Sequence, residues 1–296
     1  MIKGYLYAIL SAIIFGCSPL AAKFVYQEGL NPFILTFYRN ILALPVLYAV
    51  MRSTGERIGL NGQNRGKVLA LAVLNGVLTQ SLLFSSYLFI PSGVATSFHF
   101  IYPTAVVAAD VLLFRQKAGA AQLIGLLLCT AGVLTFYAPG QQLDGLGCLL
   151  ALLSGITYAG YILFLDHRSP DGVSTFKVSF YIAMMVSAIL GPFCVITDQF
   201  VFPPTAGCWA VCILYSLSAS VIGIVLFQKG TALIGGQRSS VLSAFEPITS
   251  VLVGVLVFQE SFGWRTAVGS GLVIAATVIL AVFDAREPAV ECGFHS

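Results

Sequence analysis

Among the ionisable side chains within otherwise apolar stretches of the chain, three are candidates for chemistry. They are Arg39, His99 and Glu246, and Pro247 directly follows the glutamate. An arginine guanidinium can hold a carboxylate or a phosphate through two parallel hydrogen bonds, and a carboxyl group or an imidazole can bind a solute or pass on a proton. Each residue also has a structural interpretation: a clamp between helices for Arg39, an ion pair or backbone hydrogen bond for Glu246, and packing for His99.

The surroundings of these residues indicate a membrane protein. Of the 296 residues, 58% are hydrophobic and only 9% are charged, and the mean hydropathy is +0.92. A water-soluble domain carries roughly 25% charged residues, so this chain cannot cover a surface that faces water. The net charge of +3 is also too small to indicate a nucleic-acid partner. The lipid bilayer is therefore the expected environment.

Apolar segments of about 20 residues, the length that crosses about 30 Å of hydrocarbon, follow one another along the chain. Charged clusters and Gly or Pro turns divide them into ten predicted spans. These are 4–25, 32–51, 68–90, 94–114, 120–138, 145–165, 176–196, 208–228, 236–258 and 264–283. We therefore expect an all-α membrane protein with ten transmembrane helices. A charge near the bilayer centre costs at least about 2.5 kcal/mol, so Arg39 and Glu246 should face a cavity or a partner.

The basic residues predict how the spans are oriented. Twelve of the fifteen fall on the side of the two termini, whereas Arg265 is alone in the loops of the opposite side. The twelve are Lys3, Arg52, Arg57, Arg65, Lys67, Arg115, Lys117, Arg168, Lys177, Lys229, Arg238 and Arg286. Because cytoplasmic loops are enriched in Lys and Arg, we expect a protein of the plasma membrane with both termini in the cytoplasm.

The chain contains an internal repeat with a period of about 143 residues. The segment GYLYAILS at 4–11 aligns with GCLLALLS at 147–154, and, with one residue inserted, Pro103 aligns with Pro247. Each copy holds five predicted spans, and because five is odd the second copy must be inverted. Inverted repeats around a central cavity are typical of secondary transporters and also occur in some channels. The predicted repeats are 1–143 and 144–296.

Aromatic and polar residues deep in the predicted spans are candidates for lining that cavity. Phe15 corresponds to Tyr158 in the repeat, and Tyr161 lies one turn after Tyr158. A tyrosine offers an apolar face and one hydroxyl, which suits amphipathic solutes. Gln80 in the third span and Tyr102 in the fourth complete the candidate substrate-binding set. Further polar candidates in the third span are Asn75 and Thr79.

Two polar stripes at helical spacing surround the ionisable residues. The stripe of the ninth span is predicted to share one helix face and consists of Ser239, Ser243, Glu246 and Ser250. The stripe of the fourth span consists of Thr96, His99, Pro103 and Asp110.

Several segments together carry a resemblance to a known family. They are Phe15-Gly16, Phe37-Tyr38-Arg39-Asn40, Phe245-Glu246-Pro247 running into Phe258-Gln259-Glu260, and Gly269-Ser270-Gly271-Leu272-Val273-Ile274. Over nearly its whole length the chain resembles the EamA-like, ten-span members of the drug/metabolite transporter superfamily. It departs from their pattern at Gln116, where the first repeat often has an acid. The resemblance implies a helical basket whose central cavity opens to alternating sides, and substrates that are small polar metabolites such as amino acids.

We therefore expect a secondary transporter of small polar or amphipathic metabolites that works by alternating access. Amino-acid-like solutes and export are favoured, and protons are a candidate coupling ion. A passive channel or facilitator is the alternative, and a membrane-embedded enzyme is less favoured because the chain has only three His residues. The sequence has no phosphate-binding loop, which argues against direct use of ATP. No cofactor or metal is expected, because Cys208 and Cys212, one turn apart, have no His nearby.

Overall fold

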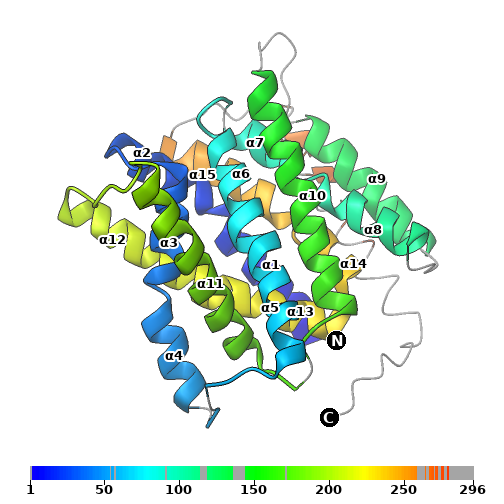
Figure 1. Ribbon diagram of the computed structural model, residues 1–296. Helices are drawn as coiled ribbons and strands as arrows, with labels where there is room; N and C mark the ends of the chain where they lie inside the picture. The colour runs from blue at the N-terminus through cyan, green and yellow to red at the C-terminus, as the bar shows by residue number, and fades with distance from the viewer. Residues whose placement is uncertain are drawn as a thin grey trace.

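The computed structural model describes residues 2–53, 55–56, 58–90, 92–113, 119–135, 144–170 and 172–258, with scattered residues between 264 and 279. This described part of the chain consists of helices and connecting segments, without a β-strand. Figure 1 shows the helices packed in a bundle, most of them running between its two ends. The all-helical prediction is therefore confirmed.

The first part of the chain contains three long apolar stretches, each made of consecutive helices. They are α1 (Ile2–Gly16) with α2 (Ser18–Gln27), α3 (Pro32–Ile41) with α4 (Leu44–Ser53), and α5 (Gly62–Leu71) with the π-helix η1 (Ala72–Thr79) and α6 (Gln80–Ser86). The shorter helices α7 (Ser92–His99), α8 (Tyr102–Leu112) and α9 (Ala120–Thr135) follow. In a π-helix the backbone hydrogen bonds join residues five apart instead of four, so each turn holds more than the α-helical number of residues.

The second part of the chain shows a related order of elements. It begins with α10 (Gly145–His167) and α11 (Thr175–Ile196). A third long stretch consists of α12 (Ala206–Tyr215), the π-helix η2 (Ser216–Gly223) and α13 (Ile224–Ile234). The helices α14 (Gly236–Leu242) and α15 (Phe245–Phe258) follow. The two π-helices thus begin 144 residues apart, close to the period of the sequence repeat.

Within the described residues, six helical stretches are long and apolar enough to cross a membrane. They are Ile2–Gln27, Pro32–Ser53, Gly62–Ser86, Gly145–His167, Thr175–Ile196 and Ala206–Ile234. Each overlaps one of the ten predicted spans. Of the other four, 94–114 and 236–258 are interrupted helices, 120–138 corresponds to α9, and 264–283 lies largely outside the described residues. The number of ten spans stays a prediction.

Capping residues fix where the helices that carry the candidate site begin. Asn31 Oδ1 accepts the backbone N–H of Ile34 at 2.9 Å, and Pro32, which has no N–H to satisfy, is the first residue of α3. Asp144 accepts two backbone N–H groups, at 2.8 and 3.0 Å, at the start of α10. These caps set the register that places Arg39 on α3 and Tyr158 on α10.

Two helices are interrupted shortly before a proline. α7 ends at His99 before Pro103 in α8, and α14 ends before Pro247 in α15. Because proline has no N–H, the carbonyl groups four residues earlier, those of His99 and Ser243, lose their helical donor. The Ser243 carbonyl accepts the N–H of Glu246 at 2.8 Å instead. Each proline therefore accounts for a break that lies next to a candidate site residue.

Helices from the two parts of the chain pack closely on one another. α1 lies along α13, with Gly4 against Leu233 and Ile234, and α10 lies along η1 and α6. α3 lies along α11, where the rings of Phe33 and Phe193 are 5.1 Å apart. The apolar core is therefore built between the two parts of the chain.

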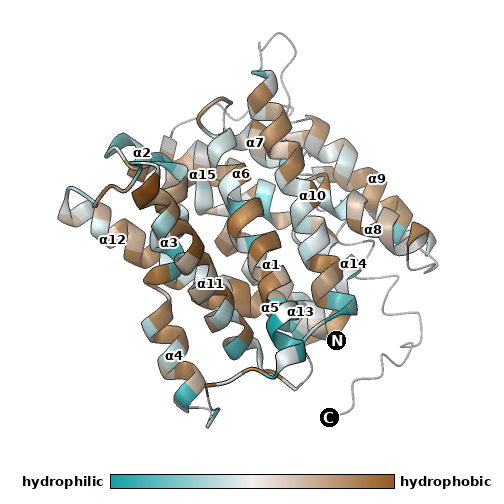
Figure 2. Cartoon of the chain, viewed as in Figure 1, coloured by the Kyte–Doolittle hydropathy of each residue, from teal (hydrophilic) through white to brown (hydrophobic). Residues whose placement is uncertain are grey.

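The two ends of the bundle differ in charge. At one end the Lys67 ammonium donates to the Ser169 carbonyl at 3.2 Å, and Asp166 packs beside Gly236. Figure 2 shows hydrophilic residues gathered there, over α5 and the adjacent ends of α4, α10 and α11. Basic residues stand at the helix ends that meet here, with Arg52 in the last turn of α4 and Arg168 directly after α10. We call it the basic end.

The opposite end is formed by the connections after α2 and α11. Asn31 Nδ2 donates to the Gln199 carbonyl at 2.7 Å, and the hydroxyl of Thr205 donates to the carboxylate of Glu28 at 2.9 Å. These bonds join residues 168 and 177 positions apart in the chain. They tie the two parts together where α3 begins, above Arg39.

Candidate binding pocket

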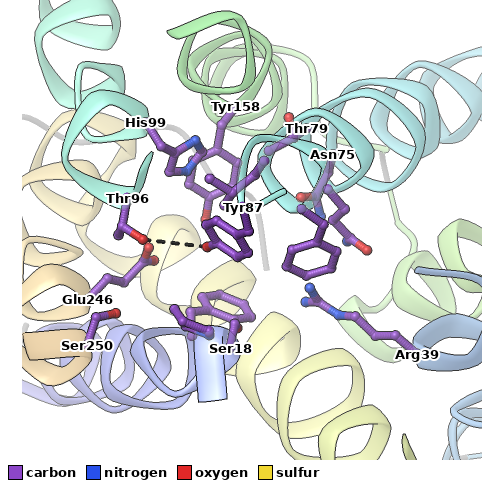
Figure 3. Close-up of a pocket in the computed structure, with 15 residues that line it drawn as sticks. Ser18, Arg39, Asn75, Thr79, Tyr87, Thr96, His99, Tyr158, Glu246 and Ser250 are labelled. Atoms are coloured by element: carbon purple, nitrogen blue, oxygen red, sulfur yellow. Dashed lines mark hydrogen bonds between the residues drawn. The ribbon is translucent and has the colours of Figure 1, made fainter. Parts of the chain in front are cut away.

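A pocket lies between the interrupted helices and the first three long stretches. Its cavity volume is about 60 Å³, and its walls come from α1, α2, α3, η1, α6, α7, α10 and α15 (Figure 3). We call it the central pocket. Six of the eight predicted site residues line it, namely Phe15, Arg39, Gln80, His99, Tyr158 and Glu246.

Arg39 reaches the central pocket from the last turn of α3 and is only 6% exposed. Its Nε donates to Ser220 Oγ at 2.9 Å, and a terminal nitrogen donates to the hydroxyl of Tyr215 at 3.1 Å. The guanidinium carbon also lies 5.7 Å from the centre of the Phe15 ring. A guanidinium has five N–H donors, so three of them have no partner among the described residues.

The interpretation of Arg39 as a clamp between helices is thus supported only in part. The groups that hold it are neutral hydroxyls on α12 and η2, and no described carboxylate forms an ion pair with it. Ser216 on η2 adds a bond from its hydroxyl to the Arg39 carbonyl at 2.7 Å. The second part of the chain therefore positions Arg39 without neutralising its charge.

Glu246 is the second residue of α15 and is 7% exposed. Its carboxylate lies next to Thr96 in Figure 3 and has no hydrogen bond to a described residue. Ser250, one turn further along α15, also lines the central pocket and donates to the Gly16 carbonyl at 2.8 Å. Within the described residues, the Glu246 side chain forms neither of the contacts that its structural interpretation requires, an ion pair or a hydrogen bond to the backbone.

The predicted polar stripe of the ninth span is divided by the break before Pro247. Ser239 and Ser243 precede the break, and their hydroxyls bond within this region, Ser243 donating to the Ser239 carbonyl at 3.1 Å. Glu246 and Ser250 follow it and line the pocket. The expectation that all four share one face of one helix is wrong, because α14 ends at Leu242 and α15 begins at Phe245.

His99 is the last residue of α7 and is 3% exposed. Its Nδ1 is 2.8 Å from the hydroxyl oxygen of Ser154 on α10. The imidazole lies beside the rings of Tyr158 and Tyr102, with centroid distances of 5.4 and 5.2 Å. His99 therefore packs against aromatic neighbours, as its structural interpretation predicts, and also lies on the wall of the pocket.

The polar groups of the central pocket are divided by chemistry. Glu246, Thr96 and His99 lie on one side, and Arg39 and the Asn75 amide lie on the other (Figure 3). The carboxylate can only accept when ionised, whereas the guanidinium can only donate. Aromatic residues occupy the space between the two sides. The pocket is therefore suited to a small molecule with a negative group at one end and a positive group or other donor at the opposite end.

Two predicted site residues, Tyr102 and Tyr161, do not line the central pocket. Both are fully buried behind Tyr158, with ring centroids 4.7 and 5.8 Å from its centroid. The Tyr161 hydroxyl accepts a bond from Gln228 Nε2 at 3.3 Å, whereas the Tyr102 hydroxyl is buried without a hydrogen-bond partner among the described residues. They support the wall of the pocket from behind.

Several lining residues were absent from the predicted site set. Phe84 and Tyr87 follow Gln80 at helical spacing, which is a signal that identifies them in retrospect. Asn75 and Thr79 were secondary candidates and do line the pocket. By contrast, no local pattern points to Tyr215 and Ser220, which hold Arg39 from more than 170 residues away.

A second and larger cavity opens at the basic end. Its volume is about 870 Å³, and Lys67, His167 and Arg168 are among its lining residues. Gln228 also lines it, with bonds of 3.3 Å to the Tyr161 hydroxyl and to the Ser179 hydroxyl. We call this cavity the vestibule. Tyr161 in turn stacks on Tyr158, so contacts of Gln228, Tyr161 and Tyr158 link the wall of the vestibule to the wall of the central pocket.

The two cysteines one turn apart lie away from both cavities. Cys208 and Cys212 are completely buried in an apolar cluster that includes Tyr38 and Ala22. Within the described residues, no group of three or more His, Cys, Asp or Glu side chains is arranged to hold a metal ion. The arrangement of this pair is that of small apolar core residues.

Comparison with known proteins identifies the fold and the family. YicL of Salmonella typhimurium, named an uncharacterized inner membrane transporter, is 27% identical over 298 residues, 97% of each chain. YcbK of Bacillus subtilis, named an uncharacterized transporter, is 23% identical over 285 residues, 90% of this chain and 89% of the relative. A crystal structure described only as that of a protein is 19% identical, has a TM-score of 0.78 and covers 95% of this chain and 98% of its own.

The family description "EamA-like transporter family" matches this sequence twice, at residues 2–138 and 145–282. The two matched ranges together cover most of the 296 residues and correspond to the two parts with paired π-helices and paired helix breaks. The resemblance noted in the sequence is therefore confirmed. The chain belongs to the EamA-like transporter family, within the drug/metabolite transporter superfamily, and is a membrane transport protein.

Proposed function

We propose that this protein is a secondary transporter that exports small zwitterionic, amino-acid-like metabolites across the plasma membrane by alternating access. The observation that carries the proposal is the division of the central pocket between Arg39 and Glu246. A carboxylate on the substrate would be held by the unused donors of the guanidinium, and an ammonium group would approach the carboxylate. The aromatic residues between them would receive the apolar part of the solute.

The size of the central pocket supports a mechanism with moving parts. A volume of about 60 Å³ is well below the roughly 300–1,000 Å³ of typical ligand pockets. A metabolite can enter only if the helices around Arg39 and Glu246 separate. Alternating access provides this separation, since one half of such a transporter rocks against the other around a site near the midplane.

The vestibule supports export as the direction. It lies at the basic end, which the positive-inside rule assigns to the cytoplasm. A solute would enter it there and reach the central pocket when Gln228 and Tyr161 move apart. The location of YicL, which is named an inner membrane protein, supports the plasma membrane as the site of action.

The proposed architecture is ten spans in two inverted repeats, 1–143 and 144–296, with both termini in the cytoplasm. The matched π-helices, the matched breaks and the collection of bases at one end support it. Reporter fusions that are active only outside the cytoplasm should be silent at Ser296 and active at Gln141. The reverse pattern would overturn both the orientation and the inversion deduced from it.

Transport itself is tested with purified protein in liposomes. We expect uptake of a radiolabelled neutral amino acid to saturate and to be accelerated by the same solute on the opposite side. Screening the neutral amino acids together with matched analogues that lack the carboxylate or the ammonium group tests the role of the divided pocket, because neither analogue should compete. Flux that neither saturates nor responds to solute on the other side would identify a channel instead.

A further inference from the structure

We propose that Ser154 fixes His99 in the tautomer that carries its hydrogen on Nδ1, so that Nε2 is a permanent hydrogen-bond acceptor for the ammonium or hydroxyl group of the substrate. The part of this inference that concerns substrate rests on the proposed transport function. The part that concerns the tautomer rests on the geometry of the two side chains alone. Ser154 acts as a positioning residue, and His99 as a specificity-determining one.

The hydrogen bonds of Ser154 determine which nitrogen of His99 is protonated. The Ser154 hydroxyl oxygen is 2.6 Å from the Ala151 carbonyl and 2.8 Å from His99 Nδ1. A hydroxyl has one hydrogen, and a carbonyl oxygen can only accept. The bond to Ala151 therefore uses that hydrogen, and the serine oxygen must accept from Nδ1. Both bonds form together only when Nδ1 carries a hydrogen.

The neutral ring then has an acceptor at Nε2. In neutral imidazole one nitrogen donates and the other accepts, so a hydrogen on Nδ1 leaves a lone pair on Nε2. Among the described residues only Ser154 forms a hydrogen bond with the ring, although His99 lines the central pocket. Leaving a buried acceptor unpaired costs roughly 1–3 kcal/mol. A donor group on the bound solute would meet this unfilled position.

The backbone holds the ring in this orientation. His99 ends α7 at the break before Pro103, and its freed carbonyl oxygen touches the position where a side chain at Gly155 would begin. Only a glycine allows this approach of α10, and the approach places the neighbouring Ser154 within reach of Nδ1. The rings of Tyr102 and Tyr158 pack against the imidazole and restrict its rotation.

The proposed acceptor lies on the appropriate side of the pocket. Glu246 and Thr96 line the same side, opposite Arg39 (Figure 3). An ammonium group has three hydrogens, so it can bind the glutamate and His99 at the same time. The acceptor side of the pocket thus consists of two groups, the Glu246 carboxylate and His99 Nε2. His99 would bind the donor end of the substrate.

The tautomer is tested directly by ¹⁵N NMR of histidine-labelled protein in nanodiscs. The chain has three His residues, and the His99→Gln variant assigns the signals of His99 by their disappearance. We expect Nδ1 to be protonated and Nε2 unprotonated in the wild type. The Ser154→Ala variant should lose this preference, whereas Ser187→Ala, which removes a buried serine bonded only to its own helix at 2.7 Å, should keep it. A wild-type ring protonated on Nε2 would overturn the proposal.

The role in recognition is tested by comparing two amides at His99. A glutamine places its carbonyl oxygen near the position of Nε2, whereas an asparagine reaches only the position of Nδ1. We expect His99→Asn to weaken zwitterion binding about 3- to 10-fold relative to His99→Gln, the effect of one hydrogen bond. Equal affinities of the two variants would remove His99 from recognition.

These measurements separate the two proposals. If the NMR signals show the expected tautomer but no amino-acid-like solute is carried, the transport proposal fails and the tautomer assignment holds. If transport is observed but the wild-type ring is protonated on Nε2, the inference about His99 fails and the transport proposal holds.

Discussion

Two interrupted helices meet at the central pocket, α7–α8 from the first part of the chain and α14–α15 from the second. Each break precedes a proline, Pro103 or Pro247. Each is also contacted by a glycine on a helix from the other part of the chain. Gly155 of α10 lies against the His99 carbonyl, and Gly16 of α1 lies against the Glu246 carbonyl. The two breaks are therefore similar in outline, although the two contacted carbonyls, those of His99 and Glu246, are not equivalent positions of the repeat.

The side chains at the two breaks are different. The residues 144 positions after His99 and Tyr102 are Ser243 and Glu246. One break thus carries an imidazole and a phenol, and the other a hydroxyl and a carboxylate. The same holds for the π-helices, where Asn75 of η1 corresponds to Ala219 of η2. A repeated backbone supplies the symmetry needed for two alternating states, and substitutions within it supply a site with distinct positive and negative ends.

The largest effect is expected from Arg39→Lys, which attacks the donor side. A lysine ammonium cannot form the planar fork, although its three hydrogens can still bind the hydroxyls of Ser220 and Tyr215. We expect affinity for a zwitterionic substrate to fall about 10- to 100-fold at an unchanged melting temperature, because hydrogen bonds to charged groups are worth about 1.5–3 kcal/mol. Binding is measured by isothermal titration and uptake in liposomes.

Ser220→Ala is the matched control for this variant. It removes one support of the guanidinium but leaves the charge and its unused donors, so it should cost less than Arg39→Lys. Normal transport by Arg39→Lys, or failure of that variant to fold, would assign Arg39 to the scaffold.

A smaller effect on affinity but a clear effect on coupling is expected from Glu246→Gln. The amide keeps the size and part of the hydrogen bonding of the side chain but cannot exchange a proton. If the carboxyl group carries a proton during the cycle, the pH dependence of transport should flatten while substrate binding stays measurable. Glu28→Gln, at the end of the bundle, is the control and should keep the wild-type pH profile. An unchanged profile in well-folded Glu246→Gln protein would reject proton coupling through this residue.

The similarity of the two breaks is tested by Gly16→Ala and Gly155→Ala. A methyl group at Gly16 would lie 2.5 Å from the Thr249 side chain and 2.6 Å from the Glu246 carbonyl oxygen, and one at Gly155 would contact the His99 carbonyl. We expect each substitution to lower the free energy of unfolding by about 1–3 kcal/mol, the usual cost of overpacking. Thermal unfolding in detergent measures the effect.

Gly160→Ala serves as the control on α10. Its added methyl would lie 3.6 Å from a methyl group of Leu74, an ordinary contact, so the melting temperature should stay close to that of the wild type. A large loss for only one of Gly16→Ala and Gly155→Ala would show that the two breaks differ in rigidity as well as in chemistry.

The sequence was most informative about residues whose charged or polar side chains are energetically unfavourable in an apolar segment. A charge within an apolar segment has to face a cavity or a partner, and Arg39, Glu246 and His99 do meet at one pocket. Their role as substrate-binding residues stays a prediction. Tyr102 and Tyr161 were placed in the site by type and depth, but the exact direction of a side chain depends on the local course of the helix, and both lie behind Tyr158.

Features that depend on distant contacts or on local departures from the α-helix could not be predicted. The hydroxyls of Tyr215 and Ser220 have no pattern that links them to Arg39, because the contact crosses between the two parts of the chain. A strict period of 3.6 residues also fails across a break, which is why Ser239 and Ser243 were grouped wrongly with Glu246. The repeat could be found in the sequence because it concerns only the order of residues along the chain. Its detection does not require knowledge of how the helices are oriented or packed.

The π-helices also affect how the chain tolerates changes in length. In an α-helix, each additional residue turns everything that follows by about 100°, so an insertion in a span normally rotates its remaining side chains to the wrong face. A π-helix absorbs additional residues by widening its turns, and η1 does so immediately before Gln80. Shortening 72–79 by a single residue would consequently narrow these turns toward the α-helical form, while Gln80 and the aromatic residues after it would keep their present face.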